Sequence, residues 1–208
     1  YTEMKKAAIT FFEENVMTAA SVLTQMIRLH QIICGHVKTD DGEIKSIKSN
    51  RIKELLEVLE ETNGKVIIWA VYRYDIQEIE RTLGEKYGKE SVATYYGDTK
   101  DNLRQSIVDR FMDADDPLRF FVGNPKTGGY GLTLTSSHTV VYYSNDYSLE
   151  VRLQSEDRAH RIGQTNKVTY VDLIADHTID EKIVKALNAK IDLASQVMGE
   201  DPKKILFG

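Results

Sequence analysis

The sequence of 208 residues is poor in the residues that cross-link small proteins or interrupt regular structure. It has one cysteine, Cys34, so no disulfide can form within the chain. It has three prolines, and residues 1–34 contain neither proline nor glycine, which favours long helices there. No run approaches the ~18 apolar residues of a membrane helix. We therefore expect a cytoplasmic protein without a bilayer span.

The chain also lacks an excess of positive charge. It has 27 lysine and arginine residues against 32 acidic residues, so its net charge is −5. The whole acidic excess lies in residues 1–116, and the remainder is balanced. This composition argues against a protein that coats nucleic acid by bulk charge, but it leaves room for a few well-placed cations in the C-terminal part.

Several catalytic motifs are missing as well. A P-loop needs the pattern G-x-x-x-x-G-K-[ST], but the pair Gly64-Lys65 is followed by a valine. There is no G-x-S-x-G nucleophile motif. His30, Cys34 and His36 lie near one another in sequence, but three residues at a helix end do not make a closed metal site. We therefore expect no bound metal on this chain.

From residue 66 onward, short apolar segments alternate with amphipathic ones. The predicted strands are residues 66–71, 92–95, 120–122, 139–143 and 168–174, and the predicted helices are residues 75–87, 103–111, 149–162 and 179–197. Short buried strands that alternate with helices indicate βαβ units and a parallel sheet covered on both faces. The aromatic residues Trp69, Tyr95, Tyr142 and Tyr143 are expected to be core packing.

The segment before this alternation has a different pattern. Residues 1–34 show apolar positions at helical spacing and predict one or two helices that end near Gly35. Residues 36–49 are polar and predict a loop, and residues 50–62 predict a helix that stops at Asn63-Gly64. We expect three parts: residues 1–49 packing on the main lobe, the lobe itself at 50–177, and a helix and tail at 178–208.

One candidate site is the glycine cluster Gly128-Gly129-Tyr130-Gly131, which follows the predicted strand ending at residue 122. Glycines let the backbone approach a phosphate and present N–H groups to it. Open α/β sheets bind ligands at the carboxyl ends of their strands, where this loop is expected. A plain tight turn is the favoured explanation of the cluster unless a second feature supports the phosphate site.

The second feature is residues 154–164, QSEDRAHRIGQ. On a helix, Arg158 and Arg161 would project from one face, and Asp157 beside them could orient one of them. Phosphate is the natural partner of two guanidinium groups because the planar fork binds its oxygens in pairs. An ordinary charged surface helix remains the alternative for the pair alone. Together, the loop and the arginines predict a phosphate site at one sheet edge, with the main nucleotide cradle elsewhere.

At this point the order of motifs resembles a known family. Residues 154–164 resemble helicase motif VI, Q-A-x-D-R-A-H-R-I-G-Q, with Ser155 in place of the alanine. Residues 126–135, KTGGYGLTLT, resemble motif V, with Thr133 where the family usually has asparagine, and residues 65–72 resemble motif IV. Gly97, Arg104 and Phe111 match a further family segment in spacing. The chain is thus similar to the C-terminal RecA-like lobe of the Snf2 (Swi2/Snf2) branch of superfamily 2 ATPases.

The resemblance implies a three-layer αβα RecA-like sandwich with a mainly parallel sheet, an N-terminal helical segment and a long C-terminal helix. In that family two lobes enclose ATP and Mg²⁺, and the first lobe carries the P-loop. The second lobe supplies arginine fingers, which match Arg158 and Arg161 here. The positions implied to line the ATP cleft are Gln154, Asp157, Gly129 and Gly131. Those implied to contact the phosphates of double-stranded DNA are Gly97, Thr99, Lys100, Lys126, Thr127 and Gly128.

We therefore expect the second motor lobe of a double-stranded-DNA-dependent ATPase. It should be monomeric and inactive in ATP hydrolysis without its N-terminal partner lobe. One alternative is a non-catalytic nucleic-acid or partner-binding module of RecA-like fold. Another is a Rossmann-like enzyme with a small ligand of its own. A compact prokaryotic or viral parent is favoured, and a eukaryotic parent would be nuclear.

Overall fold

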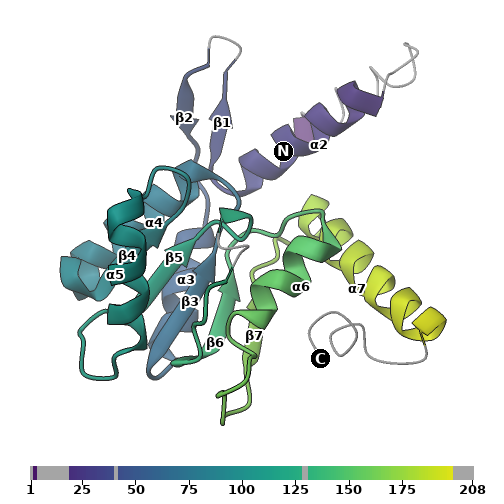
Figure 1. Cartoon of the computed structure of the whole chain (residues 1–208). Coiled ribbons are helices and arrows are strands. Elements are labelled where there is room, and N and C mark those ends of the chain that lie inside the picture. Colours follow the sequence, from purple (N-terminus) through teal and green to yellow (C-terminus); the bar gives the residue numbers. More distant parts are fainter. Residues whose placement is uncertain (1, 4–18, 40–41, 128–130, 199–208) are drawn as a thin grey trace.

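The centre of the molecule is a five-stranded sheet (Figure 1), seen in a computed structural model that describes residues 2–3, 19–39, 42–127 and 131–198. The strands lie in the order β4-β5-β3-β6-β7, and every pairing between neighbours is parallel. Their bounds are β3 Lys65–Trp69, β4 Val92–Tyr95, β5 Phe120–Gly123, β6 Ser137–Tyr142 and β7 Thr169–Asp172. The predicted parallel sheet is confirmed.

The central strand β3 shows why a continuous apolar run forms a strand here. Val66, Ile67, Ile68 and Trp69 are all fully buried, because helices cover both faces of the sheet. Val66 and Ile68 belong to the hydrophobic cluster on one face, whereas Ile67 and Trp69 belong to the cluster on the other. This split follows the two-residue period of a strand. The prediction that Trp69 is a core residue is confirmed.

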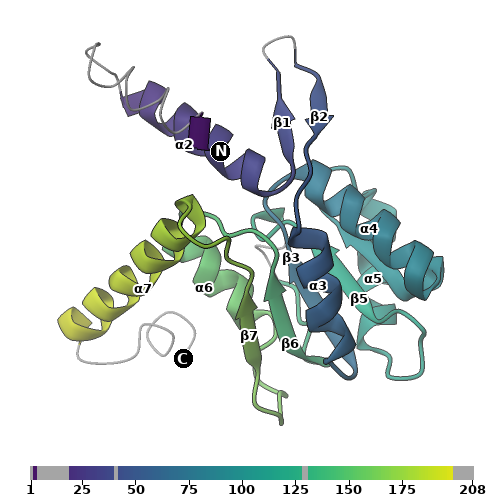
Figure 2. The same ribbon diagram turned by 180° about the vertical axis from the view of Figure 1, so that it is seen from behind.

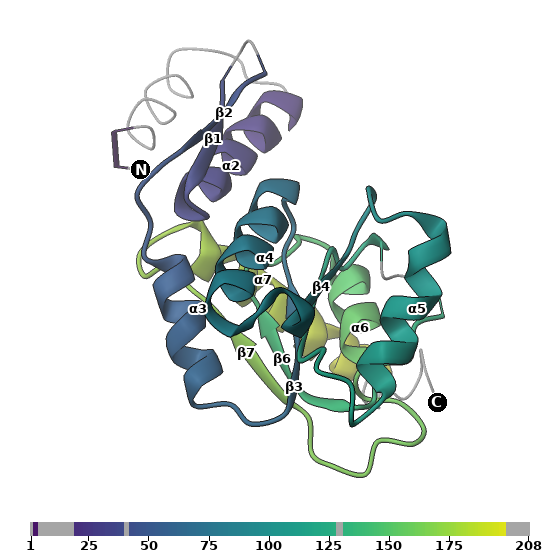
Figure 3. The same cartoon turned by 90° about the vertical axis from the view of Figure 1, so that its left-hand side faces the viewer.

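Helices form the two outer layers, as Figure 3 shows with the strands between them. Helices α3 (Arg51–Glu60) and α4 (Arg73–Tyr87) cover one face, which is turned toward the viewer in Figure 2. Helices α5 (Asp101–Met112) and α6 (Leu149–Asp157) lie on the opposite face, and a short 3₁₀ turn, η1 (Lys89–Ser91), precedes β4. The predicted three-layer αβα sandwich is confirmed.

Two further helices pack against each other beside the sandwich (Figure 1). These are α2 (Ala19–Ile33) and α7 (Ile179–Met198), whose shared cluster contains Leu29, Ile33, Ile183 and Leu187. Helix α2 is followed by Gly35 with φ +93°, so the predicted helix end is confirmed. The rest of that prediction, residues 4–18, lies outside the described residues. Among the described helices, none is long and apolar enough to cross a membrane.

A buried charge network ties α2, α3 and α7 together. Arg51 at the start of α3 forms an ion pair with Asp180 at the start of α7, and its Nη1 donates to the Leu173 carbonyl at 3.0 Å. His30 Nε2 of α2 lies 3.4 Å from the other oxygen of Asp180. All three side chains are buried. The helices outside the sandwich are thus attached through one carboxylate, while the three-part domain division remains a prediction.

The loop predicted over residues 36–49 is wrong at two places, where three residues each form strands. Strands β1 (His36–Lys38) and β2 (Ile44–Ser46) pair antiparallel and project from the body beside α2 (Figures 1 and 2). A turn closes the hairpin, in which Thr39 N–H donates to the Glu43 carbonyl at 2.8 Å and Gly42 has φ +89°. Strand β2 is wholly exposed, so its side chains carry little of the apolar alternation that marks a half-buried strand.

Candidate functional site

The carboxyl ends of β3, β4 and β5 are joined by one residue, Asn124, through its side chain and its backbone. Its Nδ2 donates to the Val71 carbonyl at 2.8 Å, and its backbone N–H donates to the Tyr95 carbonyl at 3.1 Å. Its Oδ1 accepts from the backbone N–H of Lys126 at 2.9 Å. Asn124 was not among the site residues predicted from the sequence. Its position directly after a buried strand was the available signal.

Two exposed cations at this edge are each held by a carboxylate from a neighbouring loop. Lys126 Nζ lies 2.8 Å from Asp146, and the lysine side chain is 61% exposed. Arg73 Nη2 lies 2.8 Å from Asp98, and the arginine side chain is 62% exposed. Arg73 was not among the predicted contacts, although it directly follows the motif IV segment. The edge therefore presents placed cations on a chain of negative net charge.

The turn after β4 contains three further predicted contact residues, Gly97, Thr99 and Lys100. Gly97 and Lys100 are exposed. The Thr99 hydroxyl is used within the turn, because it donates to the Thr94 carbonyl and accepts from the backbone N–H of Tyr96, both at 3.0 Å. Thr99 thus shapes the turn, whereas Gly97 and Lys100 lie at its surface.

The glycine loop is described only at its two ends. Gly128 and Gly129 lie outside the described residues, so their predicted roles stay predictions. Thr127 is half-buried, and its N–H donates to the Asn124 carbonyl at 3.1 Å. Gly131 is exposed and has φ +81°, a backbone conformation that disfavours any residue with a Cβ. The loop therefore begins where expected, directly after β5, and ends in a conformation that requires glycine.

The prediction that Arg158 and Arg161 share one face of a helix is wrong. Helix α6 ends at Asp157, four residues before Arg161. The Arg158 carbonyl accepts the N–H of Leu134 at 2.9 Å, so this carbonyl is bonded to another segment of the chain instead of extending the helix. The stretch 158–164 is a series of turns that packs on the segment leading into β6.

The two arginines nevertheless converge. Arg158 Nη1 donates to the Leu132 carbonyl at 3.4 Å, and Arg161 Nη1 donates to the same oxygen at 3.3 Å. One Asp157 oxygen lies 3.8 Å from Arg158 Nη1 and 4.0 Å from Arg161 Nε. A shared carbonyl and a shared carboxylate reduce the repulsion between the two like charges. Asp157 therefore contacts both arginines, where the sequence had suggested one.

Burial distinguishes the two guanidinium groups. The Arg158 side chain is 6% exposed, whereas the Arg161 side chain is 40% exposed. Burial lowers the pKa of Arg158, Asp157 raises it and Arg161 lowers it, so that it lies below its ordinary value. Arg158 is thus fixed by packing, and Arg161 is the guanidinium that an incoming anion can reach.

The expectation that the glycine loop and the arginines line the same sheet edge stays a prediction, because residues 128–130 lie outside the described residues. Both arginines contact the carbonyl of Leu132, which directly follows Gly131, the described end of the loop. Gln154, on α6, donates from Nε2 to Glu150 Oε1 at 3.0 Å, and its place in an ATP cleft stays a prediction.

Gln164 anchors the turn that carries Arg161. Its Nε2 donates to the carbonyls of Thr135, Ser137 and Ala159, at 3.1, 2.9 and 3.2 Å. The backbone N–H of Gln164 donates to the Arg161 carbonyl at 2.9 Å and closes the turn, in which Gly163 has φ +105°. Ile162, at the tip, is 99% exposed. The turn therefore projects from a firmly attached base.

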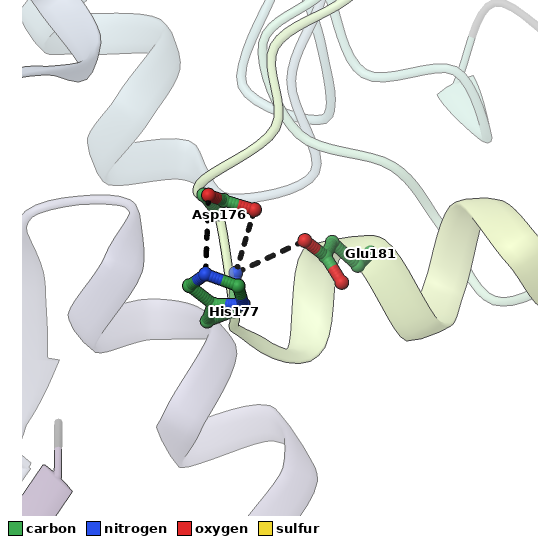
Figure 4. Close-up of side chains that lie close together, drawn as sticks. All are labelled: Asp176, His177 and Glu181. Carbon is green, nitrogen blue, oxygen red and sulfur yellow. Dashed lines mark hydrogen bonds and ion pairs between the residues drawn. The ribbon is translucent and has the colours of Figure 1, made fainter.

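One group of potential metal ligands lies close together among the described residues, at the start of α7 (Figure 4). The ligand atoms of Asp176, His177 and Glu181 lie within 4.8 Å of one another. The backbone N–H of His177 donates to Asp176 at 3.1 Å and to Glu181 at 3.0 Å, and Asp180 N–H donates to the Thr178 hydroxyl at 3.3 Å. These are the contacts of a helix N-terminal cap, and they account for the cluster without an ion.

The sequence of the chain matches a known protein family. Residues 47–163 match the family described as the helicase conserved C-terminal domain. The ATP-dependent helicase fft2 of Schizosaccharomyces pombe is 30% identical over 196 residues, which span 93% of this chain and 15% of fft2. The ATP-dependent helicase FUN30 of Saccharomyces cerevisiae is 29% identical over 183 residues, 84% of this chain and 16% of FUN30. The chain thus spans about a sixth of the length of these curated relatives.

Solved structures show the same likeness. The C-terminal part of the Fun30 ATPase domain is 28% identical with a TM-score of 0.61, and the match covers 67% of this chain and 46% of that one. The Sulfolobus solfataricus SWI2/SNF2 ATPase core in complex with double-stranded DNA is 24% identical with a TM-score of 0.70, covering 92% of this chain and 41% of that one. The chain belongs to the helicase conserved C-terminal domain family and has the fold of the C-terminal lobe of SWI2/SNF2 ATPases.

Proposed function

We propose that the chain is the second motor lobe of an ATP-dependent double-stranded-DNA translocase. In this role Arg158 and Arg161 supply positive charge beside the phosphates of an ATP that a P-loop lobe binds, and Arg161 makes the direct contact. The observation that carries the proposal is the convergence of the two guanidinium groups on Leu132 and Asp157, with Arg161 still 40% exposed. The resemblance of residues 154–164 to motif VI supports the same role.

The donor set fits a triphosphate. A guanidinium presents paired N–H groups that match phosphate oxygens, and a positive charge at the transferred phosphoryl group is typically worth ~10³–10⁵ in rate. ATP supplies the phosphoryl group and Mg²⁺ the neutralising charge, both held mainly by the P-loop lobe. On this chain, Arg161 binds and orients the transferred phosphoryl group. Asp157 keeps the two arginines together, and Arg158 supports the base of the turn that carries Arg161.

The carboxyl edge of the sheet would contact the DNA backbone. Lys126, Arg73 and Lys100 are exposed there, and Asn124 holds two of the loops that carry them. Contacts of this kind go to phosphates and carry no base sequence directly. The lobe should therefore bind duplexes of different sequence with similar affinity, and the binding should weaken with salt.

The proposal predicts that the chain alone hydrolyses no ATP and that activity returns when a P-loop lobe is added. ATP turnover is measured with the chain alone, with the P-loop lobe alone and with both, each with and without duplex DNA. Turnover that appears only with both lobes and DNA supports the motor role. Robust turnover by the chain alone contradicts it, and failure of the mixture supports the alternative of a non-catalytic binding module.

In a parent chain carrying both lobes, Arg161→Ala should lower DNA-stimulated ATP turnover by about 10³-fold or more, while ATP binding remains largely intact. The reason is that the guanidinium acts on charge that develops during transfer. Turnover is followed by phosphate release, and binding by a fluorescent nucleotide. Arg81→Ala, which removes an exposed arginine paired within α4, is the matched control and should leave both unchanged. Surviving turnover in Arg161→Ala would show that Arg161 is not the finger.

A further inference from the structure

We infer that Thr133 is a positioning residue, whose hydroxyl sets the orientation of the Arg161 guanidinium. The inference rests on the proposed function of Arg161. It concerns a position where the sequence has threonine and the resembled family usually has asparagine. The observation that supports the inference is a hydrogen bond in which Arg161 Nη1 donates to the Thr133 hydroxyl at 3.3 Å.

The segment around Thr133 is fixed in a way that turns this side chain outward. Leu132 and Leu134 are buried in the core cluster between the sheet and α5, whereas Thr133 between them is half-buried. Leu134 is further tied by its N–H to the Arg158 carbonyl, and Ser136 Oγ donates to the Phe111 carbonyl at 2.7 Å. In an extended segment, neighbouring side chains point to opposite sides. The Thr133 hydroxyl is thus held toward the turn that carries Arg161.

Arg161 depends on such contacts more than Arg158 does. The Arg158 side chain is buried, so packing limits its rotamers, but Arg161 is 40% exposed and its long side chain has many conformations. Two acceptors bind Arg161 Nη1, the Leu132 carbonyl and the Thr133 hydroxyl, both at 3.3 Å. A single acceptor would let the guanidinium pivot, whereas two acceptors define its plane.

The remaining contacts show which edge of the guanidinium is left for phosphate. Nε lies 4.0 Å from Asp157, and Nη1 is bound to Leu132 and Thr133. Within the described part of the chain, Nη2 of Arg161 contacts no acceptor. Thr133 and Asp157 therefore hold two nitrogens of Arg161, and the third can donate to a phosphoryl oxygen. A misplacement of about 1 Å at such a group can cost about 10²-fold in rate.

The first test needs no nucleotide. In the chain described here, rotation of the guanidinium about its Cζ–Nε bond can be measured by ¹⁵N NMR, with Arg161→Lys identifying the signal. Thr133→Val keeps the branched shape but removes the acceptor, and should speed rotation of Arg161 by about 3-fold or more, as expected for loss of one modest hydrogen bond. Thr133→Ser restores the hydroxyl and should restore slow rotation. Thr135→Val is the matched control, and its Arg161 signal should match the wild type.

The second test uses the two-lobe parent. Thr133→Val should lower kcat about 10-fold with KM for ATP unchanged, and Thr133→Ser should recover most of kcat. In an Arg161→Ala background, Thr133→Val should have no further effect, because the two residues act through the same group. A merely structural role would lower stability and would add to the loss in that background.

The outcomes separate this inference from the proposed function. If Arg161→Ala abolishes turnover but Thr133→Val leaves both kcat and guanidinium rotation unchanged, the positioning role is overturned and the finger stands. If Arg161→Ala leaves turnover intact, the proposed role of Arg161 fails. In that case, guanidinium rotation that still responds to Thr133→Val and Thr133→Ser supports the contact between Arg161 and the Thr133 hydroxyl. A full additive loss in the double variant also overturns the positioning role.

Discussion

At the scale of single residues, Asp180 links helix α7 to both α2 and α3. It accepts from the Ala175 backbone N–H at 3.0 Å, pairs with Arg51 and lies 3.4 Å from His30. Burial would raise the pKa of Asp180, but the nearby His30 ring, the charge of Arg51 and the Ala175 N–H together lower it below its usual value. The carboxylate is therefore stable in a buried place because the Arg51 guanidinium and polar N–H groups surround it.

This environment predicts a stability that depends on acid. Because the pKa of Asp180 is lower in the folded chain, its contribution is present above the unfolded pKa of about 3.8 and is lost as the pH falls through the folded value. Asp180→Asn leaves Arg51 buried without its counter-charge and should lower the free energy of unfolding at pH 7 by about 3–5 kcal/mol. The difference in the free energy of unfolding between Asp180→Asn and the wild type should shrink below pH 3.8.

Urea unfolding at pH 7 and at pH 3 checks this prediction. Asp176→Asn, an exposed carboxylate four residues earlier, serves as the control and should change stability little at either pH. An Asp180→Asn variant with wild-type stability at pH 7 would show that the ion pair contributes nothing to the attachment of α7.

At the scale of elements, the position of Arg161 depends on where helix α6 ends. The helix stops at Asp157, and the following turns bring Arg161 over the segment that leads into β6. Gly163 in the last of these turns has φ +105°, although a Cβ there would meet no atom within 4 Å. The requirement for glycine is therefore conformational and does not come from crowding.

Gly163→Ala should accordingly lower the free energy of unfolding by about 1–2 kcal/mol, because the left-handed conformation is costly for a residue with a Cβ. Gly97→Ala is the matched comparison, since a Cβ there also meets nothing within 4 Å but the backbone is not left-handed. It should be neutral or stabilising by about 0.4–1 kcal/mol through the unfolded chain. Thermal unfolding of both variants measures the contrast, and equal effects would contradict the conformational reading.

The same elements show what the sequence could and could not predict. The strands of the sheet were found because buried parallel strands are continuous apolar runs, and β3 is the clearest case. The hairpin β1–β2 was missed because an exposed two-stranded ribbon needs no apolar alternation. The end of α6 was missed because it depends on a long-range bond, from Leu134 N–H to the Arg158 carbonyl, which no local pattern reveals. Motif order did identify Arg158 and Arg161, but the contacts of Arg161 with Leu132 and Thr133 needed the fold.

At the scale of the whole molecule, the local charge at one edge of the sheet differs in sign from the net charge of the chain. The chain has a net charge of −5, yet Lys126 and Arg73 stand exposed at the carboxyl edge of the sheet. Asp146 and Asp98 hold these cations in the free chain. A DNA phosphate would therefore have to replace a carboxylate at each position, so binding should be modest and sensitive to salt.

Lys126→Ala and Arg73→Ala should each weaken binding of a DNA duplex and reduce the slope of log Kobs against log salt by about 1. Lys53→Ala on α3 removes an equally exposed lysine from one outer face of the sandwich, and should leave the slope unchanged. Fluorescence anisotropy with duplexes of two unrelated sequences, across a salt series, checks the prediction. A slope that responds to Lys53 as much as to Lys126 would show that binding is diffuse.

The strand order also has a consequence for synthesis on the ribosome. Strand β3 is the first of the five to be made but lies in the middle of the sheet, and its neighbours β5 and β6 begin only at Phe120 and Ser137. Until those strands emerge, both edges of β3 have unpaired backbone groups along its apolar residues 66–69, although α3, α4 and α5, which are made earlier, can cover its faces. The nascent chain is therefore most prone to aggregate between the emergence of Trp69 and that of Tyr142, and chaperones that bind extended apolar segments would act in that interval.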